Sequence, residues 1–359
     1  MKSTMMTLAV VFFGVVSIGD GATIVIVGPF GEILQSTDNG DSWSMRSSGT
    51  SNTLLDVECK SDGNCWAVGD NGTVVHSADG GATWASQNSG TTGELRDVVF
   101  VDSLVGWAVG DLTEVDEIIS DTVIHTVDGG NTWVSESISP TNRFQAVDFV
   151  DDNNGWVTAV SGSIFHTNDG GANWSPQTSG VTAKILAVDF FDVDKGWYVG
   201  SDVSSAIGRT VDGGVTWTPQ AVLFPTLWIE LDFVDESNGW AAGDFGYVVH
   251  TVDGGVSWNL QNTGTSVTLF DIEMLDLNTG WFVGTGGIMR RTVDGGSTWI
   301  TQSHGSTTDL RAIAEPSTLF LAAFALLGLT CGRPRRPPLP NSVTENTLLA
   351  IRMGFQIPF

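Results

Sequence analysis

The sequence predicts an all-β fold, a seven-bladed β-propeller with four antiparallel strands per blade. An eight-residue motif, Ser/Thr-x-Asp-x-Gly-x-Thr/Ser-Trp, recurs along the 359 residues with steps of 41, 49, 41, 43, 41 and 41. Each repeat holds four strand-like segments, and such a unit of about forty residues is typical of one propeller blade. The seven copies are centred on Asp38, Asp79, Asp128, Asp169, Asp212, Asp253 and Asp294.

The sixth repeat shows the order of strands within a blade. Apolar segments at 231–234, 239–243 and 247–251 predict three strands, and a fourth begins at Trp258. The motif therefore falls in the turn between the third and fourth strands. Asp and Gly suit such a turn, because Gly tolerates positive φ and the carboxylate accepts backbone N–H groups. We predict a structural role for the seven motif aspartates, with the motif Trp burying an apolar face against the blade.

The ring is predicted to close by joining the two ends of the repeat region. Residues 22–28 align with the second strand of the other repeats, so the first blade lacks its own first strand. Residues 308–314 align with first strands such as 93–99. A C-terminal strand is therefore expected to complete blade one and to remove an open sheet edge. Residues 22–314 form one predicted domain.

Both ends of the chain carry expected targeting segments. Lys2, an apolar core at 8–18 and a small-x-small site ending at Gly19 predict a signal peptide over 1–19. Near the other end, Glu315-Pro316-Ser317, an apolar stretch at 319–329 and a cluster of arginines follow the propeller. Residues 315–336 resemble a PEP-CTERM sorting signal, although Ala314 replaces its first proline and an unassigned tail, 337–359, follows.

That resemblance implies processing by an exosortase-type machinery and an exported protein in the periplasm or at the cell surface. A plain C-terminal membrane anchor is the alternative interpretation of the same stretch, with the basic flank on the cytoplasmic side.

The net charge limits the classes of partner, and the cysteines raise the question of a disulfide. The chain has 15 Lys+Arg against 41 Asp+Glu, a formal net charge of −26. Such a surface repels nucleic acid, which is therefore excluded as a partner. Cys59 and Cys65 face each other across a predicted hairpin, so either a local disulfide or two free thiols is expected in an exported protein.

No cofactor or metal is expected. His76, His125, His166 and His250 occupy the same place in the third strand of their repeats, so a seven-fold ring keeps them apart and they are interpreted as scaffold. The turn at 38–41 has some of the spacing of a calcium loop. The other six turns lack its extra carboxylate, which favours structural capping.

The motif resembles the Asp-box, or BNR repeat, of sialidases, sortilin-type receptors and several glycan-active propellers, where it implies a fold and not an activity. A glycan-binding or glycan-cleaving propeller of the cell surface matrix is therefore the alternative function. The whole repeat region is more similar to the photosystem II assembly and stability factor family. The shared segments are Gly-Trp-Ala-Val-Gly at 106–110 and His-Thr-x-Asp-Gly-Gly-x-Thr-Trp at 125–133. This resemblance implies a non-catalytic role in binding a protein, with a membrane-protein subunit as the partner in photosynthetic members.

The candidate binding residues lie where first strands begin. Trp228 breaks the tryptophan repeat and is expected in the connection before the first strand of blade six, either as an exposed anchor for a partner or sugar ring or as core between blades five and six. Cationic residues at matching places predict a basic spot within the acidic surface that favours an acidic segment. The predicted partner-binding residues are Trp228, Arg96, Arg143, Lys184, Glu230 and Arg311.

Overall fold

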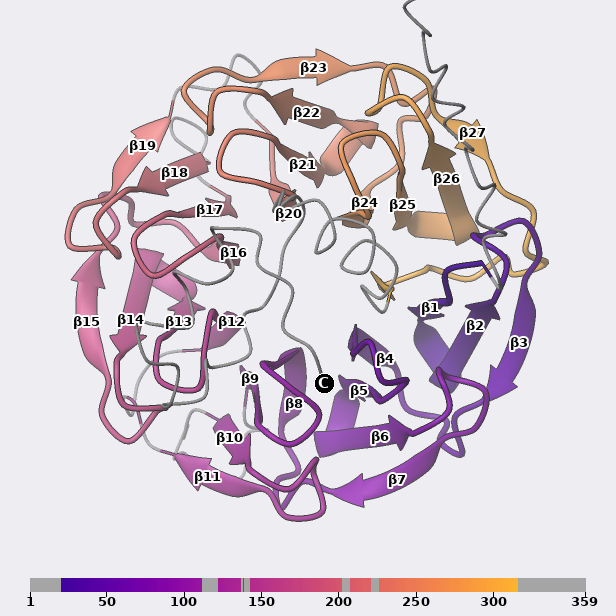
Figure 1. Cartoon of the computed structure of the whole chain (residues 1–359), viewed down its shortest axis with the longest axis horizontal. Helices are drawn as coiled ribbons and strands as arrows, with labels where there is room; N and C mark the ends of the chain where they lie inside the picture. The colour runs from indigo at the N-terminus through magenta and orange to yellow at the C-terminus, as the bar shows by residue number, and fades with distance from the viewer. Residues whose placement is uncertain are drawn as a thin grey trace, which may run out of the picture.

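The computed structural model shows seven four-stranded antiparallel sheets arranged as blades around a ring (Figure 1). The predicted seven-bladed propeller is therefore confirmed. The residues that the structure describes are 21–111, 122–136, 138, 143–201, 207–220 and 226–315. The expected signal peptide, the tail and, apart from Glu315, the sorting signal lie outside them.

Each blade contributes one strand to each of four layers, here called A to D from the centre outward. The A strands are β28 (Ala312–Ala314), β4 (Leu54–Cys59), β8 (Glu94–Phe100), β12 (Phe144–Phe149), β16 (Ile185–Phe190), β20 (Trp228–Phe233) and β24 (Leu269–Met274). The B strands are β1 (Ile24–Val27), β5 (Cys65–Gly69), β9 (Gly106–Asp111), β13 (Gly155–Ala159), β17 (Gly196–Gly200), β21 (Gly239–Gly243) and β25 (Gly280–Gly284). The C strands are β2 (Glu32–Ser36), β6 (Thr73–Ser77), β10 (Thr122–Thr126), β14 (Ser163–Thr167), β18 (Ile207–Thr210), β22 (Val248–Thr251) and β26 (Ile288–Thr292). The D strands are β3 (Ser44–Ser47), β7 (Ala85–Asn88), β11 (Val134–Glu136), β15 (Ser175–Thr178), β19 (Thr218–Gln220), β23 (Asn259–Gln261) and β27 (Ile300–Thr301).

Strand direction gives the ring two different faces. On the Asp-box face, the C–D turn of a blade is held to its A–B turn, as where the Gly213 N–H donates to the Asp194 carbonyl at 2.8 Å. On the opposite face, called the loop face, the B–C and D–A connections meet, as where the Ser201 N–H donates to the Lys184 carbonyl at 2.9 Å. In the part of the chain that the structure describes, five B–C connections contain short 3-10 turns: η1 (Pro29–Gly31), η2 (Asp70–Gly72), η3 (Val160–Gly162), η4 (Asp244–Gly246) and η5 (Thr285–Gly287). Among the described residues, no helix has the length and apolar character needed to cross a membrane.

The ring closes between the two ends of the domain. Strand β28 pairs antiparallel with β1, with Ile313 opposite Ile26. The Arg311 N–H also donates to the Val27 carbonyl at 2.8 Å. Blade one is thus completed by the C-terminal strand, as the repeat alignment predicts, and its sheet has no open inner edge.

Blades pack through a repeated aromatic stack. Trp107 in β9 lies between His125 of its own blade, at 4.7 Å between ring centroids, and Phe149 of the next blade, at 3.5 Å. Its indole N–H donates to the Gly170 carbonyl in the Asp-box turn of that next blade at 3.3 Å. The same Trp–His and Trp–Phe pairs recur around Trp66 and Trp156. Each junction therefore joins the sheet core of one blade to the turn of its neighbour.

The Asp-box carboxylates hold their turns together. In blade five, Asp212 Oδ1 accepts the Thr210 hydroxyl at 2.9 Å and the Thr216 N–H at 2.8 Å, and Oδ2 accepts the Thr216 hydroxyl at 2.7 Å. The same three bonds form in the other six boxes, with the Asn173 amide replacing the last hydroxyl in blade four. These hydrogen bonds lower the pKa of all seven aspartates, led by the bond from the second hydroxyl or amide. The geometry is that of a cap for the turn.

Candidate partner-binding site

A ring of bulged residues surrounds the centre of the loop face. In the A strands of blades two to seven, the pairing with the B strand skips one residue near the start, which is the mark of a β-bulge. A bulge redirects its side chain away from the regular pleat and is common beside functional sites. The skipped residues are Leu55, Arg96, Gln145, Leu186, Ile229 and Phe270, and Arg311 holds the equivalent place in blade one.

Side chains of this ring touch across a blade junction. The Arg311 guanidinium lies 4.1 Å from the centroid of the Phe270 ring in the neighbouring blade seven. Arg311 also pairs with Asp309 at 3.0 Å. Such a cation over an aromatic face is favourable and fixes both groups. This contact joins the bulged positions of blades seven and one; the seven bulged positions, with Arg143 and Lys184 beside them, are called the rim.

Cationic side chains gather on the other side of the rim, over blades three to five. Arg96 pairs with Glu94 at 2.7 Å and with Asp111 at 3.0 Å, so much of its charge is compensated. Arg143 and Lys184 stand just before β12 and β16 and are exposed. The structure records no ion pair for either of them among the described residues. Their backbone carbonyls accept N–H groups from the B–C connections, which fixes the two residues on the loop face.

Below the rim, the next position of the A strand carries carboxyl groups in four blades. Asp56, Asp97 and Asp271 each accept a backbone N–H from the A strand of the following blade at 2.7–2.8 Å. Glu230 accepts the Leu231 N–H at 3.0 Å. Burial raises the pKa of all four, to about 7 for Asp271. Their mutual repulsion adds to this, as between Asp97 and Asp56 or between Glu230 and Asp271. Near neutral pH this layer therefore carries less negative charge than four fully ionised carboxylates would.

Trp228 does not lie in the connection before blade six, where we expected it. It is the first residue of β20 and pairs with Gly243. Its side chain is fully buried and packs with Trp197, Phe233 and Trp258, between blades five and six. The reason is its register: the residue just before the bulged position of each A strand is buried in the blade core, as Leu54, Leu95 and Leu269 are. The structure thus places Trp228 where the core interpretation put it, and the half-buried apolar side chains of the rim nearby are Ile229 and Phe270.

Sequence analysis missed the apolar half of the rim. Leu55, Leu186, Ile229 and Phe270 are half-buried, and the last three lie in the consecutive blades five to seven. An alignment of the seven A strands places them in one column with Arg96 and Arg311. That shared position could have identified them as candidate binding residues from the sequence. The bulge that gives the column its special orientation could not be read from the residues.

The remaining expectations about chemistry concern histidines, cysteines and a calcium loop. The four histidines lie in the blade junctions against tryptophans, and burial lowers the pKa of His76, His166 and His250. Asp41, the extra carboxylate of the first box, pairs with Arg291 of blade seven at 3.1 Å. Within the described ranges no group of three or more metal-ligating side chains comes together.

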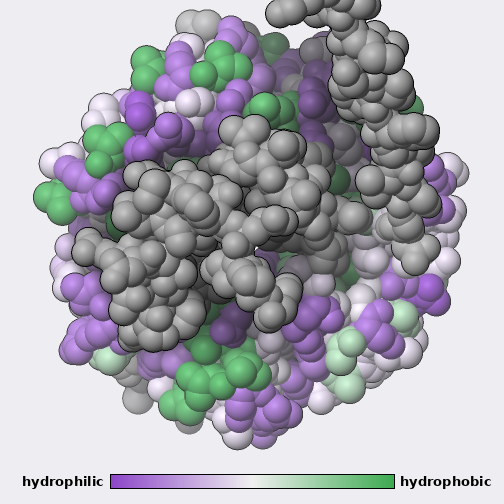
Figure 2. Space-filling view, viewed as in Figure 1, coloured by the Kyte–Doolittle hydropathy of each residue, from purple (hydrophilic) through white to green (hydrophobic). Residues whose placement is uncertain are grey.

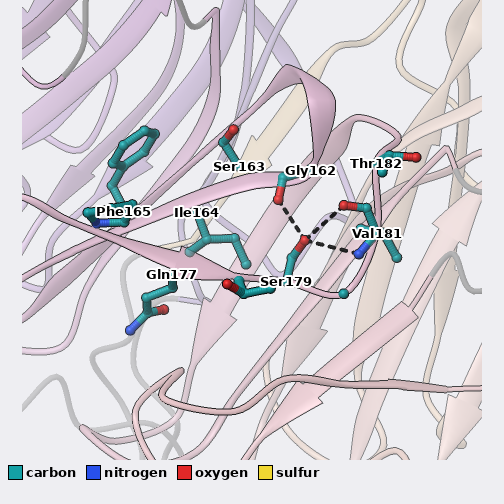
Figure 3. Close-up of a pocket in the computed structure, with 11 residues that line it drawn as sticks. Gly162, Ser163, Ile164, Phe165, Gln177, Ser179, Val181 and Thr182 are labelled. Atoms are coloured by element: carbon teal, nitrogen blue, oxygen red, sulfur yellow. Dashed lines mark hydrogen bonds between the residues drawn. The ribbon is translucent and has the colours of Figure 1, made fainter.

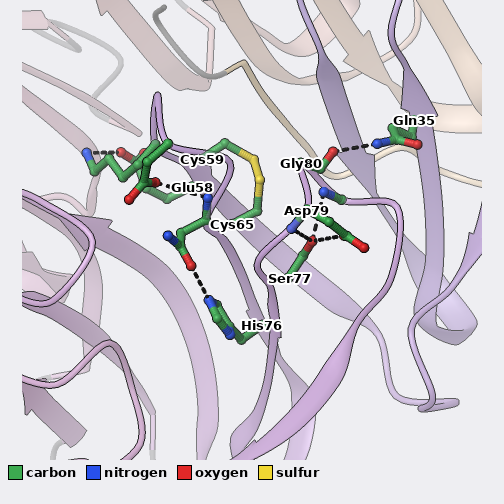
Figure 4. Close-up of a disulfide and its surroundings, with 12 residues drawn as sticks. Gln35, Glu58, Cys59, Cys65, His76, Ser77, Asp79 and Gly80 are labelled. Carbon is green, nitrogen blue, oxygen red and sulfur yellow. Dashed lines mark hydrogen bonds and ion pairs between the residues drawn. A yellow bond between two sulfur atoms is a disulfide. The ribbon is translucent and has the colours of Figure 1, made fainter.

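Of the two states that the sequence left open for Cys59 and Cys65, the structure contains the disulfide, which joins the end of β4 to the start of β5 (Figure 4). It occupies a place that other blades fill differently. In blade three, Phe100 covers Gly106, leaving no room for a Cβ there. In blade two, the two sulfur atoms take the place of that ring. The bridge is therefore part of the junction between blades one and two.

A shallow pocket lies at the outer edge of blade four, between η3, the outer strand β15 and the connection that follows β15. In Figure 3 the Ser179 hydroxyl points at the Gly162 carbonyl, 2.6 Å away, and at the backbone of Val181. The hydroxyl is thus engaged by the scaffold. No carboxylate or histidine lines this pocket, so its described lining offers no acid or base for catalysis.

The sequence matches the family model of the photosynthesis system II assembly factor YCF48 in three overlapping segments, residues 37–116, 95–179 and 175–264. Together they span more than half of the chain. The chain belongs to the YCF48 family. No curated protein matches the sequence.

Two solved structures of the YCF48 family share the fold. YCF48 bound to D1 peptide is 22% identical, with a TM-score of 0.57 over 69% of this chain and 80% of that one. YCF48 from Cyanidioschyzon merolae is 21% identical, with a TM-score of 0.57 over 70% of this chain and 86% of that one. A GH74 xyloglucanase from Xanthomonas campestris, 13% identical, has a TM-score of 0.58 over 69% of this chain and 45% of that one. At these identities the likeness concerns the fold.

Proposed function

We propose that the protein is a non-catalytic binding and assembly propeller that captures a segment of a membrane-protein subunit at the centre of its loop face. Membership of the YCF48 family and the relative bound to a D1 peptide support a protein ligand. The observation that carries the proposal is the rim itself, in which Arg143 and Lys184 are exposed beside half-buried apolar side chains.

The rim fits an extended segment that combines acidic and apolar side chains. Exposed cations attract the acidic groups and accelerate encounter, while apolar contacts at the centre supply affinity. The carboxyl layer below opposes this attraction less than four ionised carboxylates would, because burial raises the pKa of its groups. Glu230 belongs to that layer and would contact only a side chain that enters it.

The proposal includes an exported location, in the periplasm or at the cell surface, with the C-terminal apolar stretch as an anchor. The apparent signal peptide and the PEP-CTERM-like segment support this placement. An anchored propeller would meet membrane subunits at the bilayer surface, where their newly made segments emerge.

Binding of a D1 peptide, measured by isothermal titration calorimetry, tests the function. We expect the double variant Arg143→Ala, Lys184→Ala to weaken binding about tenfold or more, equivalent to about 1.4 kcal/mol. Lys195→Ala is the matched control, since Lys195 is also a surface cation but lies on the Asp-box face and is paired with Glu236. Equal affinity of the double variant would exclude the rim as the site. Binding or turnover in a glycan and glycoside screen would instead support the glycan-directed alternative.

A further inference from the structure

Most of the large exposed apolar side chains of the Asp-box face lie on three adjacent blades, and a smaller set, Leu104 and Val127, lies on blade three. Seven exposed side chains, between 41% and 79% accessible, stand on the box turns and A–B turns of blades five to seven. We call this set the apolar arc: Val193, Val211, Val215, Val252, Val256, Leu277 and Val293. At the corresponding box positions, blades one, two and four carry Thr37, Asp41, Ala78, Ala82, Asn168 and Ala172. Figure 2 shows hydrophobic patches over the outer parts of blades five and six, with a further one over blade three.

The arc is held in a fixed shape by the junctions beneath it. The Trp197 indole donates to the Gly254 carbonyl at 2.8 Å, and the Trp240 indole donates to the Gly295 carbonyl at 3.2 Å. These bonds tie the box turns of blades six and seven to the blade before each. Lys195 in blade five also pairs with Glu236 in blade six on this face. Several exposed apolar groups that gather on one rigid face indicate an interaction site, whereas single ones need no explanation.

The chain leaves the propeller at the blade-seven end of the arc. All A strands run from the loop face to the Asp-box face, and β28 ends there, with Ala314 opposite Val25. β28 lies beside β24, since the Ile313 N–H donates to Asp271 at 2.7 Å. The next residue, Glu315, is buried near Asp276, whose charge helps to raise its pKa. Asp276 precedes Leu277, a member of the arc.

The sequence that follows has the chemistry of a ligand for this surface. After three intervening residues, 316–318, an uncharged apolar stretch runs from Leu319 to Leu329. Arg333, Arg335 and Arg336 come next. The arc is apolar, and carboxylates surround it: Asp192, Asp194, Asp235, Glu236 and Asp276. The C-terminal sequence therefore complements this surface in two respects. Its apolar stretch matches the apolar arc, and the arginines that follow are opposite in charge to the surrounding carboxylates.

We propose that residues 319–336 bind in cis to the apolar arc, with the apolar stretch on its valines and leucines and the arginines on the surrounding carboxylates. Burial of the leucine side chains on the arc removes apolar surface from water, and a short tether gives a local concentration on the order of millimolar. The arc thereby shields an apolar segment from water and leaves the loop face free. A bilayer competes for the same segment, because it cannot occupy both places at once.

A fluorescent reporter on the full-length chain tests this inference. Cys331 is first replaced by Ser, since Cys59 and Cys65 are joined in a disulfide. Val252→Cys is then labelled with bimane, and Val127→Cys serves as the matched control, because Val127 has the same box position in blade three and is 63% exposed against 60% for Val252. We expect blue-shifted emission at position 252 and water-like emission at position 127.

Replacing Leu319, Leu321, Leu326 and Leu327 by Ser is expected to shift the emission at position 252 to the control value and to leave position 127 unchanged. Adding zwitterionic phosphatidylcholine vesicles is expected to have the same direction of effect, by extracting the segment. Emission at position 252 that equals the control from the start would overturn the inference. So would a blue shift that disappears on dilution, which indicates a second copy, or one that appears only with vesicles, which indicates a bilayer contact of the arc itself.

Discussion

The junctions inside the propeller and the two junctions that flank blade one use different chemistry. Between blades two and three, three and four, and four and five, a histidine, a tryptophan and the next blade's phenylalanine form one stack. Around blade one this stack is absent. These three interior junctions therefore rely on repeated apolar and aromatic packing, while the ring closure relies on a cross-link, a short strand pairing and charged groups.

At the junction of blades one and two, every member of the stack is replaced. Val25 stands in the place of the tryptophan and Gln35 in the place of the histidine, and Cys59 with Cys65 substitutes for the Phe–Gly pair. The Gln35 amide donates to the Gly80 carbonyl at 2.5 Å, the bond that a tryptophan makes elsewhere (Figure 4).

At the junction of blades seven and one, Trp281 is kept but its neighbours change. Arg291 lies 5.2 Å from the centroid of the Trp281 ring, in the place of the histidine, and reaches Asp41 of blade one. Glu315 takes the strand position that holds phenylalanine in four blades. Closure is therefore the part of the ring that we expect to respond to pH and salt.

The largest effect is expected from removing the closing strand. A chain that stops before Leu310 loses the β28–β1 pairing and exposes the edge of β1, so the melting temperature should fall by several degrees or more. Thermal denaturation followed by circular dichroism measures this. A chain that stops after Glu315 keeps β28 and serves as the control. An unchanged melting curve for the shorter chain would contradict the role of β28 in stability.

The next effect is expected at the disulfide. Replacing Cys59 and Cys65 by Ser should cost about 2 kcal/mol for so short a loop, or a fall in melting temperature of roughly 4–8 °C. The variant Cys59→Phe, Cys65→Gly restores the pair found in blade three. Because Val25 offers no indole for stacking, we expect this variant to recover only part of the loss. Full recovery would show that the aromatic pair suffices without the tryptophan.

A pH-dependent effect is expected from Glu315. Burial, with the charges of Asp232 and Asp276, raises its pKa from 4.5 to about 8. The folded state thus keeps a proton that the unfolded state releases, so this group's contribution to stability is full below about pH 4.5 and is lost as the pH rises through about 8.

Glu315→Gln removes that titration. The difference in unfolding free energy between variant and native chain, from urea denaturation at pH 4 to 9, should move in favour of the variant across this window. Other titrating groups, such as Asp271, are present in both chains, so their contributions to the unfolding free energy cancel in this difference. A difference that stays constant from pH 4 to 9 would refute the assignment.

The ring and its closure could be predicted from the sequence, because the Asp-box and the strand pattern are local and recur along the chain. It placed Cys59 and Cys65 at the ends of adjacent strands for the same reason. The candidate site consists of residues that depart from the repeat, and the repeat pattern does not predict which way their side chains point. Trp228 is an example: a shift of one position decides whether a side chain enters the blade core or the rim. The pKa values of Asp97 and Glu230 likewise depend on groups brought together from different blades.

The smallest effect is expected from the charged contact that joins blade seven to blade one. Asp41 is mostly exposed, so its ion pair with Arg291 contributes less than about 1 kcal/mol, and the position of Arg291 over Trp281 adds a similar amount. Asp41→Asn should therefore lower the melting temperature by roughly 1–2 °C at low salt and have no effect in 1 M NaCl, where the pair is screened. Arg291→His restores the residue type of blades two, three, four and six. If stacking is what the position needs, this variant should match the native chain at high salt while losing the salt dependence. A stability loss that is equal at both salt concentrations would show that Arg291 acts through packing of its side chain and not through its charge.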